Sequence, residues 1–275
     1  MSAASAADHA AALALIEARG KARLLPLLTS ADVSFTVDRA YALADEIRRL
    51  RIAAGDTPRG YKIGFTNRGI WQRYGVRAPI WGPIWNSTLE FASSANEVAV
   101  SLAPFVQPRL EPEIVFSFAQ APAAGMDEAE LAACIEWVAH GFEIVHTHFE
   151  GWRFQAADTV ADFALHGRLI VGTRVPVAAF GADLGAALSK LRVTLACDGL
   201  DIETGCAEIV LGGPLTALRL WVDAMAAQPQ RWPIERGDIV TTGTITDAAP
   251  MRPGERWHTR IDDDRLQGLV LHTTA

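Results

Sequence analysis

The stretch Arg109-Leu-Glu-Pro-Glu-Ile-Val-Phe-Ser-Phe118 is the part of the sequence that decides the fold. Every second residue from Leu110 is apolar, which predicts a β-strand because successive side chains of a strand point to opposite faces. The apolar face of this strand consists of Leu110, Pro112, Ile114, Phe116 and Phe118. The other face carries Glu111 and Glu113, roughly 7 Å apart along the chain.

Similar short runs, separated by glycine and proline, continue on both sides of this stretch. We expect strands near residues 61–65, 96–101, 109–118, 141–147, 167–172, 191–198, 238–242, 256–261 and 268–273. Helices are expected near residues 127–138 and 214–227. Many short strands with few helices predict a β-rich α+β domain.

The residues before Gly60 have a helical pattern instead. Apolar periodicity predicts one helix over about residues 4–19 and another over residues 34–51, and Gly55 and Pro58 break the second. We therefore expect a helical N-terminal segment over residues 1–58 and a β-rich domain over residues 59–275.

The composition is that of a globular protein, because half of the 275 residues are apolar and 21% are charged. The formal net charge of −7 disfavours nonspecific nucleic-acid binding, which depends on lysine and arginine neutralising phosphates. The nearest thing to a basic run, Arg48, Arg49 and Arg51, is expected to be a solvated helix face.

The cysteines and the N-terminus favour a cytoplasmic protein. Cys134, Cys197 and Cys206 form no CxxC pair, so neither a zinc site nor a disulfide framework is indicated. The N-terminus lacks the basic region of a signal peptide. No run approaches 18 consecutive apolar residues, so we expect no membrane span and no membrane partner.

The two glutamates of the central strand are candidate metal ligands. Carboxylates on one face repel each other unless a cation lies between them, and carboxylate oxygen is the ligand that Mg²⁺, Mn²⁺ and Ca²⁺ prefer. Glu143, inside the apolar run Gly141-Phe-Glu-Ile-Val145, could complete a three-carboxylate site from a second strand. The alternative is an amphipathic strand with glutamates on its wet face, because spacing alone does not show that the strands are neighbours.

Three further stretches carry polar groups of interest. Lys62, in Gly60-Tyr-Lys-Ile-Gly-Phe-Thr66, is one of only three lysines against 22 arginines. Its ammonium could pair with a substrate carboxylate or move a proton, or it could reach solvent. Thr244, beside Gly243, could donate a hydrogen bond to an anion, although threonine is also common in strands. His146 and His148 are expected to be structural or surface residues.

In Asp158-Thr-Val-Ala-Asp162, Asp158 is either a functional acid or a helix cap. The sequence contains no GxxxxGK[ST], GxGxxG, HExxH or GxSxG motif. Nucleotide-driven chemistry and serine hydrolysis through a nucleophile elbow are therefore disfavoured.

The order of these pieces resembles the 2-keto-4-pentenoate hydratase family of the fumarylacetoacetate hydrolase superfamily, whose close relatives include 4-oxalocrotonate decarboxylases. The resemblance extends from about residue 10 to residue 273, and five or six stretches in the same order make it specific. These stretches are 60–66, 107–113, 142–145, 158–162, 211–218 and 237–244.

The resemblance implies a β-rich, fumarylacetoacetate-hydrolase-like mixed-sheet fold, with the catalytic domain over residues 59–275 behind the helical segment. It implies that Glu111, Glu113 and Glu143 bind Mg²⁺ or Mn²⁺.

The resemblance also implies that Lys62 and Asp158 face a small 2-oxo acid substrate, with Gly243 and Thr244 near its carboxylate. The implied activity is the addition of water to a 2-hydroxydienoic acid in aromatic-compound catabolism, by a homo-oligomer. Decarboxylation and carbon–carbon hydrolysis of a related acid are alternatives, because all three reactions pass through the same kind of enolate. A catalytically silent, metal-binding relative is a further alternative.

The sequence departs from the family pattern at four positions. Asn86 and Ser87 stand where many hydratases carry acids, Phe163 replaces a polar residue, and His166 is an unexpected titratable group. These departures bear on the hydration step and the substrate more than on the metal ligands.

Overall fold

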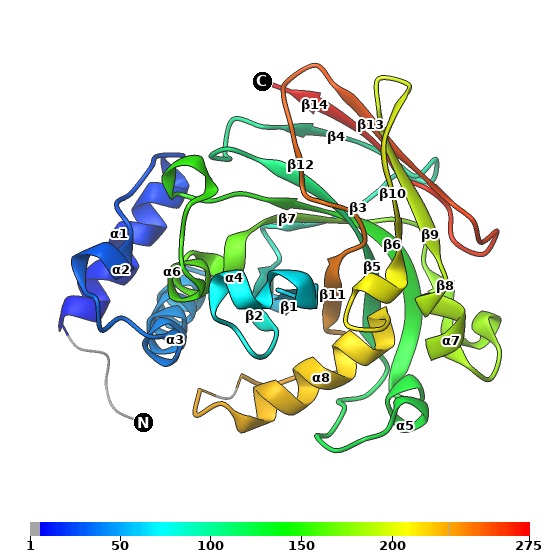
Figure 1. The fold of residues 1–275 in the computed structure, drawn as a ribbon, viewed down its shortest axis with the longest axis horizontal. Coiled ribbons are helices and arrows are strands. Elements are labelled where there is room, and N and C mark those ends of the chain that lie inside the picture. The colour runs from blue at the N-terminus through cyan, green and yellow to red at the C-terminus, as the bar shows by residue number, and fades with distance from the viewer. Residues whose placement is uncertain (1–5, 231) are drawn as a thin grey trace.

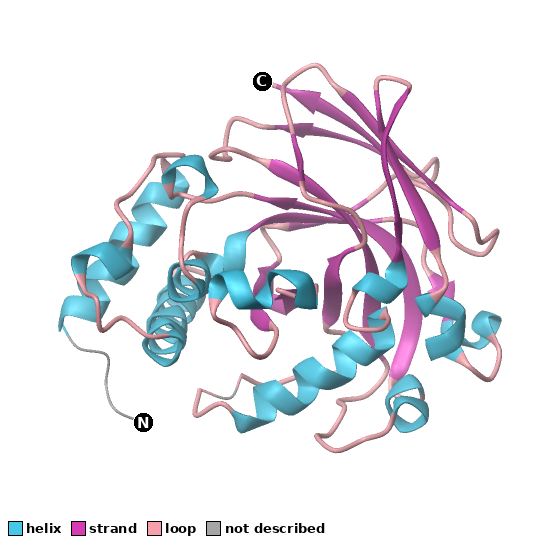
Figure 2. Ribbon diagram, in the orientation of Figure 1, coloured by secondary structure: helices cyan, strands magenta, loops and turns pink. Residues whose placement is uncertain are grey.

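A computed structural model describes residues 6–230 and 232–275 (Figures 1 and 2). Its α-helices are α1 (Ala6–Gly20), α2 (Leu28–Ala31), α3 (Val37–Ala53), α4 (Trp71–Tyr74), α5 (Glu128–Ala132), α6 (Ala156–Ala161), α7 (Leu184–Ser189) and α8 (Pro214–Ala227). Its strands are β1 (Pro58–Gly64), β2 (Ile80–Trp85), β3 (Leu89–Phe91), β4 (Glu97–Ser101), β5 (Arg109–Phe118), β6 (Ile135–Val145), β7 (His166–Val171), β8 (Val175–Pro176), β9 (Arg192–Cys197), β10 (Leu200–Cys206), β11 (Ile239–Thr244), β12 (Ala249–Pro250), β13 (Arg256–Ile261) and β14 (Val270–Thr274).

The larger of two sheets has β5 at its centre. Its strand order is β2-β1-β11-β5-β6-β7-β3, with β12 beside β5 and β8 beside β6. The pairs β1–β11 and β3–β7 are parallel and the other pairs are antiparallel, so the sheet is mixed. The expectation of an α+β, mixed-sheet fold is confirmed.

The smaller sheet has the order β10-β9-β13-β14-β4, and it packs against one face of the larger sheet. A core cluster joins the two sheets through Leu110, Phe142, Ile144 and Ile170 on one side and Val100, Leu195, Trp257 and Leu271 on the other. His140 also connects the sheets, because its ring contacts the Glu113 carbonyl at 3.0 Å and Thr259 Oγ1 at 2.8 Å. This packing fixes β5 and β6 against the smaller sheet.

Helices α3 and α8 cover the larger sheet on the side away from the smaller one (Figure 2). Thr36 caps α3 by accepting a hydrogen bond from the Arg39 amide, and Pro214 opens α8 at a position where its missing N–H costs nothing. The helices and the sheet share a second, larger core that includes Leu43, Phe116 and Trp221.

All nine expected strands are present, as β1, β4, β5, β6, β7, β9, β11, β13 and β14. The expected helices are present as α1, α3, α5 and α8, although residues 4 and 5 of the first lie outside the described residues. The expected helix over residues 127–138 is too long. Helix α5 ends at Ala132, because the chain from Ile135 pairs with β5 as β6.

Strands β2, β3, β8, β10 and β12 were not expected. β2 is entirely buried, but its sequence contains Gly82 and Pro83, which usually mark turns. Pro83 is tolerated because β2 lies at the edge of its sheet, where a proline need not donate to a neighbouring strand. A side chain at residue 82 would meet the Phe163 carbonyl at 2.9 Å, so glycine lets the next segment pass closely.

The segment Ala207–Ala227 is long and apolar enough to qualify by composition as a membrane span. Its most apolar window is 56% buried in the fold, and α8 buries Leu218 and Trp221 against the sheet. The burial identifies this segment as a core helix.

Candidate active site

The register between β5 and β6 brings the three glutamates together. Glu111 pairs directly with Glu143, so both side chains lie on the same face, and Glu113 lies two residues further along that face. Carboxylate oxygens of the three residues all lie within 4.8 Å of one another. The strands that carry them are therefore neighbours, which spacing in the sequence did not show.

The carboxylates are only partly supplied with hydrogen-bond donors. Glu113 and Glu143 are fully buried, and Glu111 is half-buried. Glu113 Oε2 accepts a hydrogen bond from the Gly243 amide at 2.8 Å, and Glu143 Oε1 lies 2.7 Å from His166 Nδ1. Glu113 Oε1 and Glu143 Oε2 accept no hydrogen bond. Buried oxygens without donors are costly, so this set is suited to a cation.

The electrostatics of the cluster are unbalanced. Burial raises the pKa of Glu111 to about 8, against the opposing effect of Lys62. Burial, together with the charge of Glu143, raises the pKa of Glu113 to about 8. Burial also raises the pKa of Glu143. Three acids thus share one nearby ammonium, and a divalent ion would remove the excess of negative charge.

Lys62 supplies that ammonium. It is buried in β1, with Nζ 3.0 Å from the Ala164 carbonyl oxygen and 3.4 Å from Glu143 Oε2. Burial lowers its pKa, but the charges of Glu143, Glu111 and Glu113 outweigh burial and raise the pKa above the ordinary value. The alternative that Lys62 reaches solvent is excluded.

Gly243 and Thr244 lie beside the carboxylates, at an irregularity in β11. Pairing with β5 shifts in register just before Thr244, which frees the Gly243 amide for Glu113. Gly243 has φ of 102°, and a Cβ there would lie 1.8 Å from Thr66 Oγ1, so both conformation and space require glycine. The Thr244 hydroxyl donates to the Thr246 carbonyl at 2.7 Å.

Asp158 is not brought into this cluster. It lies in the first turn of α6, where Oδ2 accepts from the Gln155 amide at 3.0 Å and from the Thr29 hydroxyl at 2.7 Å. Oδ1 accepts from the Thr29 amide at 3.0 Å. Both oxygens of Asp158 thus accept hydrogen bonds from the scaffold, and its predicted role toward the substrate stays a prediction. Its carboxylate turns back toward the start of α6, where it holds α2.

A pocket of about 220 Å³ lies against Lys62 and Glu111, and Gly243 and Thr244 also line it. Its remaining wall includes four aromatic rings beside aliphatic and polar side chains. The rings are Phe65, Tyr74, Trp152 and Phe154. Phe65 contacts Tyr74, Tyr74 contacts Phe154, and Phe154 contacts Trp152. An apolar wall opposite a charged end fits a small acid with an unsaturated hydrocarbon chain.

Arg109 is a second cation in this pocket, and its guanidinium stacks on Trp152 at 4.2 Å. It lies on the same face of β5 as Glu111, two residues away. That period-two spacing is the signal from which Arg109 could have been predicted.

His166 acquires a role that its sequence position did not suggest. Nδ1 faces Glu143, and Nε2 lies 2.9 Å from the Thr88 hydroxyl. Burial, reinforced by Arg19 and Lys62, lowers its pKa well below the ordinary value, so the ring is neutral. With Glu143 ionised, Nδ1–H donates to the carboxylate and Nε2 accepts from Thr88. His166 therefore orients one of the three glutamates.

The other departures from the family pattern lie outside the pocket. Asn86 Oδ1 accepts a hydrogen bond from the Thr57 amide at 2.8 Å, and the Ser87 hydroxyl donates to Asp56 at 2.8 Å. Both residues fix the turn between β2 and β3.

No protein-family model matches the chain. The chain is 31% identical over 251 residues to 2-hydroxyhexa-2,4-dienoate hydratase of Comamonas testosteroni, covering 90% of this chain and 91% of the relative. It is 30% identical to 4-oxalocrotonate decarboxylase of a Pseudomonas species and 30% identical to 2-keto-4-pentenoate hydratase 1 of Dechloromonas aromatica. Each of these two alignments covers 95% of this chain and 96% of the relative.

Solved structures show the same fold. The TM-score is 0.86 with 4-oxalocrotonate decarboxylase from Pseudomonas putida G7, complexed with magnesium and adipate, at 24% identity and 97% coverage of both chains. It is 0.58 with fumarylpyruvate hydrolase from Pseudomonas aeruginosa, in complex with Mn²⁺ and pyruvate, at 14% identity and coverage of 78% and 89%. With its sequence relatives at 30% identity or more, the chain belongs to the 2-keto-4-pentenoate hydratase and 4-oxalocrotonate decarboxylase family of lyases.

Proposed function

We propose that this enzyme is a divalent-metal-dependent hydro-lyase that adds water to a small 2-hydroxydienoic acid in the catabolism of aromatic compounds. The observation that carries the proposal is the cluster of Glu111, Glu113 and Glu143, whose oxygens lie within 4.8 Å of one another beside buried Lys62. The relatives at 30% identity or more are hydratases and decarboxylases, which fits this cluster.

Glu111, Glu113 and Glu143 would hold Mg²⁺ or Mn²⁺. Two buried oxygens that accept no hydrogen bond, one of them 3.4 Å from the Lys62 ammonium, and the all-carboxylate set suit a hard cation. When bound, such an ion supplies Lewis-acid polarisation of a 2-oxo group. His166 would keep Glu143 in one orientation, and the Gly243 amide would do the same for Glu113.

Lys62 is positioned to hold a proton next to the substrate. Because the neighbouring acids raise its pKa, it is an ammonium at neutral pH. It therefore acts as a hydrogen-bond donor and proton source in the resting enzyme, not as a base. The pocket's aromatic wall, with Tyr74 and Phe154, would exclude bulk water from the hydrocarbon chain.

Arg109 favours a second candidate, the decarboxylation of a 2-oxo dicarboxylic acid. Its guanidinium lines the same pocket as Lys62, so one substrate could place a carboxylate at each cation. The acid side chains of Glu203 and Asp247 line this pocket as well and oppose a second anion, so we place hydration first.

The experiment that tests the proposal is product analysis. The purified enzyme with Mg²⁺ is incubated with 2-hydroxydienoates, 4-oxalocrotonate and acylpyruvates, and products are identified by mass. Hydration adds 18 mass units and decarboxylation removes 44. Turnover of the dienoates that EDTA abolishes would support the proposal. Turnover of 4-oxalocrotonate alone would replace it with the decarboxylase, and no turnover of any acid would leave the silent relative.

The metal ligands are tested by Glu113→Gln, which keeps the shape but removes a charge. Isothermal calorimetry should show Mg²⁺ or Mn²⁺ affinity reduced by a factor of at least roughly 100, as for loss of a charged ligand. Glu136→Gln, at an exposed position of the same sheet, is the matched control and should bind metal normally. If wild type binds no divalent ion even with oxalate present, the metal-dependent mechanism is wrong.

We also propose that the enzyme is a cytoplasmic homo-oligomer whose partner is a small molecule, without nucleic-acid or membrane partners. The net charge of −7 and the family of small-molecule enzymes support this. Sedimentation equilibrium at micromolar concentration measures the subunit number, and a monomeric mass would contradict it.

A further inference from the structure

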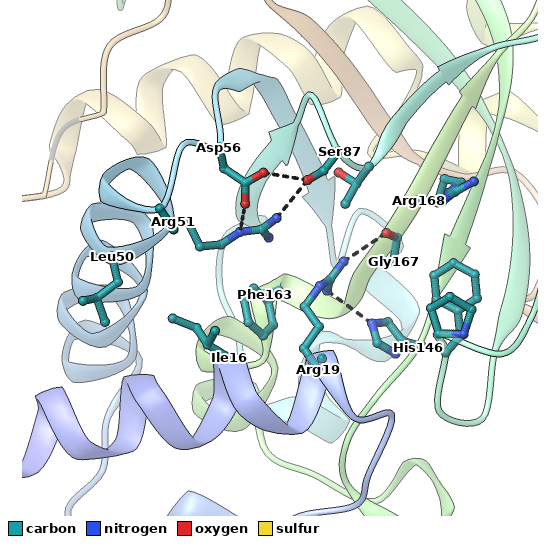
Figure 3. Close-up of a pocket in the computed structure, with 15 residues that line it drawn as sticks. Ile16, Arg19, Leu50, Arg51, Asp56, Ser87, His146, Phe163, Gly167 and Arg168 are labelled. Atoms are coloured by element: carbon teal, nitrogen blue, oxygen red, sulfur yellow. Dashed lines mark hydrogen bonds and ion pairs between the residues drawn. The ribbon is translucent and has the colours of Figure 1, made fainter.

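A second and larger hollow, which we call the arginine cavity, lies between α1, α3 and the start of β7 (Figure 3). Its volume is about 410 Å³, and it shares no lining residue with the pocket beside the glutamates. Three arginines line it, Arg19, Arg51 and Arg168, against one acid, Asp56.

The charge of this cavity is not balanced by the protein. Arg51 Nε pairs with Asp56 at 2.7 Å, and Arg168 pairs with Glu90 at 2.9 Å. Arg19 forms no ion pair within the described part of the chain. Its guanidinium instead donates to the carbonyl oxygens of His166 at 2.6 Å and Gly167 at 3.0 Å, and Figure 3 shows the contact with Gly167. Arg19 is half-buried, and Asp162 and Asp56 favour its charge only from beyond ion-pair distance, so an anion bound beside it would be stabilised.

His146 provides an independent sign of a missing acceptor. Its Nδ1 faces the Val106 amide at 3.2 Å, and its Nε2 faces Arg19 Nη1 at 3.2 Å. Both partners are donors, but a neutral imidazole has one acceptor nitrogen and one N–H. One of the two contacts must therefore bring two N–H groups together. An anionic oxygen beside Arg19 and Nε2–H would accept from both and remove this conflict.

Arg51 has a free donor as well. Its side chain is 11% exposed, its Nε is bound to Asp56, and its Nη2 donates to Ser87 Oγ at 3.1 Å. Its Nη1 has no hydrogen-bond partner. One unsatisfied guanidinium donor, on Arg51, thus belongs to a residue that lines the hollow. The rest of the wall is largely apolar and includes Ile16, Leu50, Phe105 and Phe163.

We propose that the arginine cavity is a second ligand site, which binds a small monocarboxylic acid with an apolar body. A planar carboxylate matches the donor geometry of guanidinium groups, and one negative charge balances Arg19. The hydrocarbon body would pack on Leu50 and Phe105. The volume is in the range of sites for small organic ligands. Inorganic phosphate would match the cations but leave the apolar wall uncovered.

The test is titration of the purified, full-length enzyme with benzoate by isothermal calorimetry, with benzyl alcohol and inorganic phosphate as comparison ligands. Benzoate should bind, benzyl alcohol should not, and phosphate should bind at least tenfold more weakly. Binding should persist in EDTA and in Glu113→Gln, because the site does not use the glutamate cluster. Its failure is thereby distinguishable from failure of the metal-dependent mechanism.

Two variants locate the ligand. Ala54→Trp adds bulk at an exposed position on the rim of the cavity, and it should abolish benzoate binding. Ala53→Trp is the matched control, because Ala53 is exposed at the end of the same helix but does not line the cavity. Arg51→Gln should weaken binding at least tenfold. Absence of benzoate binding to wild type, equal binding of phosphate, or unchanged binding by Ala54→Trp would each overturn the proposal.

Discussion

The two hollows of this enzyme have opposite electrostatic character, although a single segment separates them. The glutamate pocket, beside Lys62 and Glu111, has an excess of negative charge, whereas the arginine cavity has an excess of positive charge. Phe163 lines the cavity, and the next two residues, Ala164 and Leu165, line the pocket. In both hollows the folded chain leaves charge uncompensated, and it does so where a ligand can enter.

The dividing segment is strained. Phe163, Ala164 and Leu165 have φ values of 55°, 50° and 65°, a region that residues other than glycine rarely adopt. The strained backbone presents the Ala164 carbonyl to Lys62 at 3.0 Å. A conformation of this kind persists only where the surroundings hold it, and such residues cluster at functional sites. This segment therefore shapes both hollows, because its residues line one or the other.

The largest effect is expected for Lys62→Met, which removes the only ammonium of the glutamate pocket. Turnover should fall by roughly 10²–10⁴, as for loss of a positioned proton donor. The metal-free variant should also melt earlier, because three acids lose their counter-charge, and Mg²⁺ should restore most of the melting temperature. Steady-state kinetics on the substrate found by product analysis measures the loss. Lys190→Met, at an exposed helix end, is the control, and full activity of Lys62→Met would refute the role.

The sequence predicted the site features that depend on the alternation of side chains within a single strand. Glu111 and Glu113 were placed on the same face because alternation within a strand needs no knowledge of its neighbours. Glu143 could be assigned only through the family resemblance, because strand register is a long-range property. The same holds for the fold. Apolar runs revealed nine strands, but β10, with exposed Leu200 and Ile202, carries little apolar signal.

The arginine cavity could not be predicted at all. Arg19 contacts the Gly167 carbonyl across 148 positions of sequence, and no local pattern links them. The orientation of Asp158 could not be predicted for a related reason. Its spacing fits both a cap and a functional acid, and only the packing of α2 on α6 shows which way the carboxylate turns. His166 was recognised as unusual, yet its contact with Glu143 depends on how β7 pairs with β6.

The next largest effect is expected at His166, which lies beside the dividing segment. Replacing it by alanine removes the hydrogen bond that orients Glu143 and should weaken Mg²⁺ affinity roughly 10–100-fold. His166→Gln retains a side-chain donor and should recover part of the loss. Because the effect acts through the metal, saturating Mg²⁺ should restore much of the turnover. Equal metal affinity in wild type and His166→Ala, measured by calorimetry, would show that Glu143 needs no such support.

A smaller effect is expected at Asp158, where a substitution should change stability more than turnover. Asp158→Asn should lower the free energy of unfolding by about 1–3 kcal/mol, because a buried charged acceptor is lost to Thr29 and the start of α6. Turnover per folded molecule should change less than about threefold, since Asp158 does not line the glutamate pocket. Urea denaturation and active-site-normalised kinetics provide the two numbers. A large fall in turnover with normal stability would return Asp158 to the catalytic residues.

The smallest effect is a pH dependence that should have opposite signs with and without metal. Glu111 and Glu113 have folded-state pKa values of about 8 against an ordinary value of 4.5. Between these values the folded, metal-free protein binds more protons than the unfolded chain, so stability falls as pH rises. His140, with a pKa lowered to about 4 from 6.5, acts in the other direction, but its contribution is complete above pH 6.5. The melting temperature in EDTA should therefore drop by a few degrees between about pH 7 and pH 8. With saturating Mg²⁺ it should stay level or rise, because the ion binds the deprotonated carboxylates and its affinity grows with pH.

Glu113→Gln should flatten the EDTA curve, whereas Ala54→Trp, which alters only the arginine cavity, should follow wild type. A metal-free melting temperature that rises across this window would mean that burial does not raise the pKa values of these glutamates, and the predicted pH dependence would be wrong.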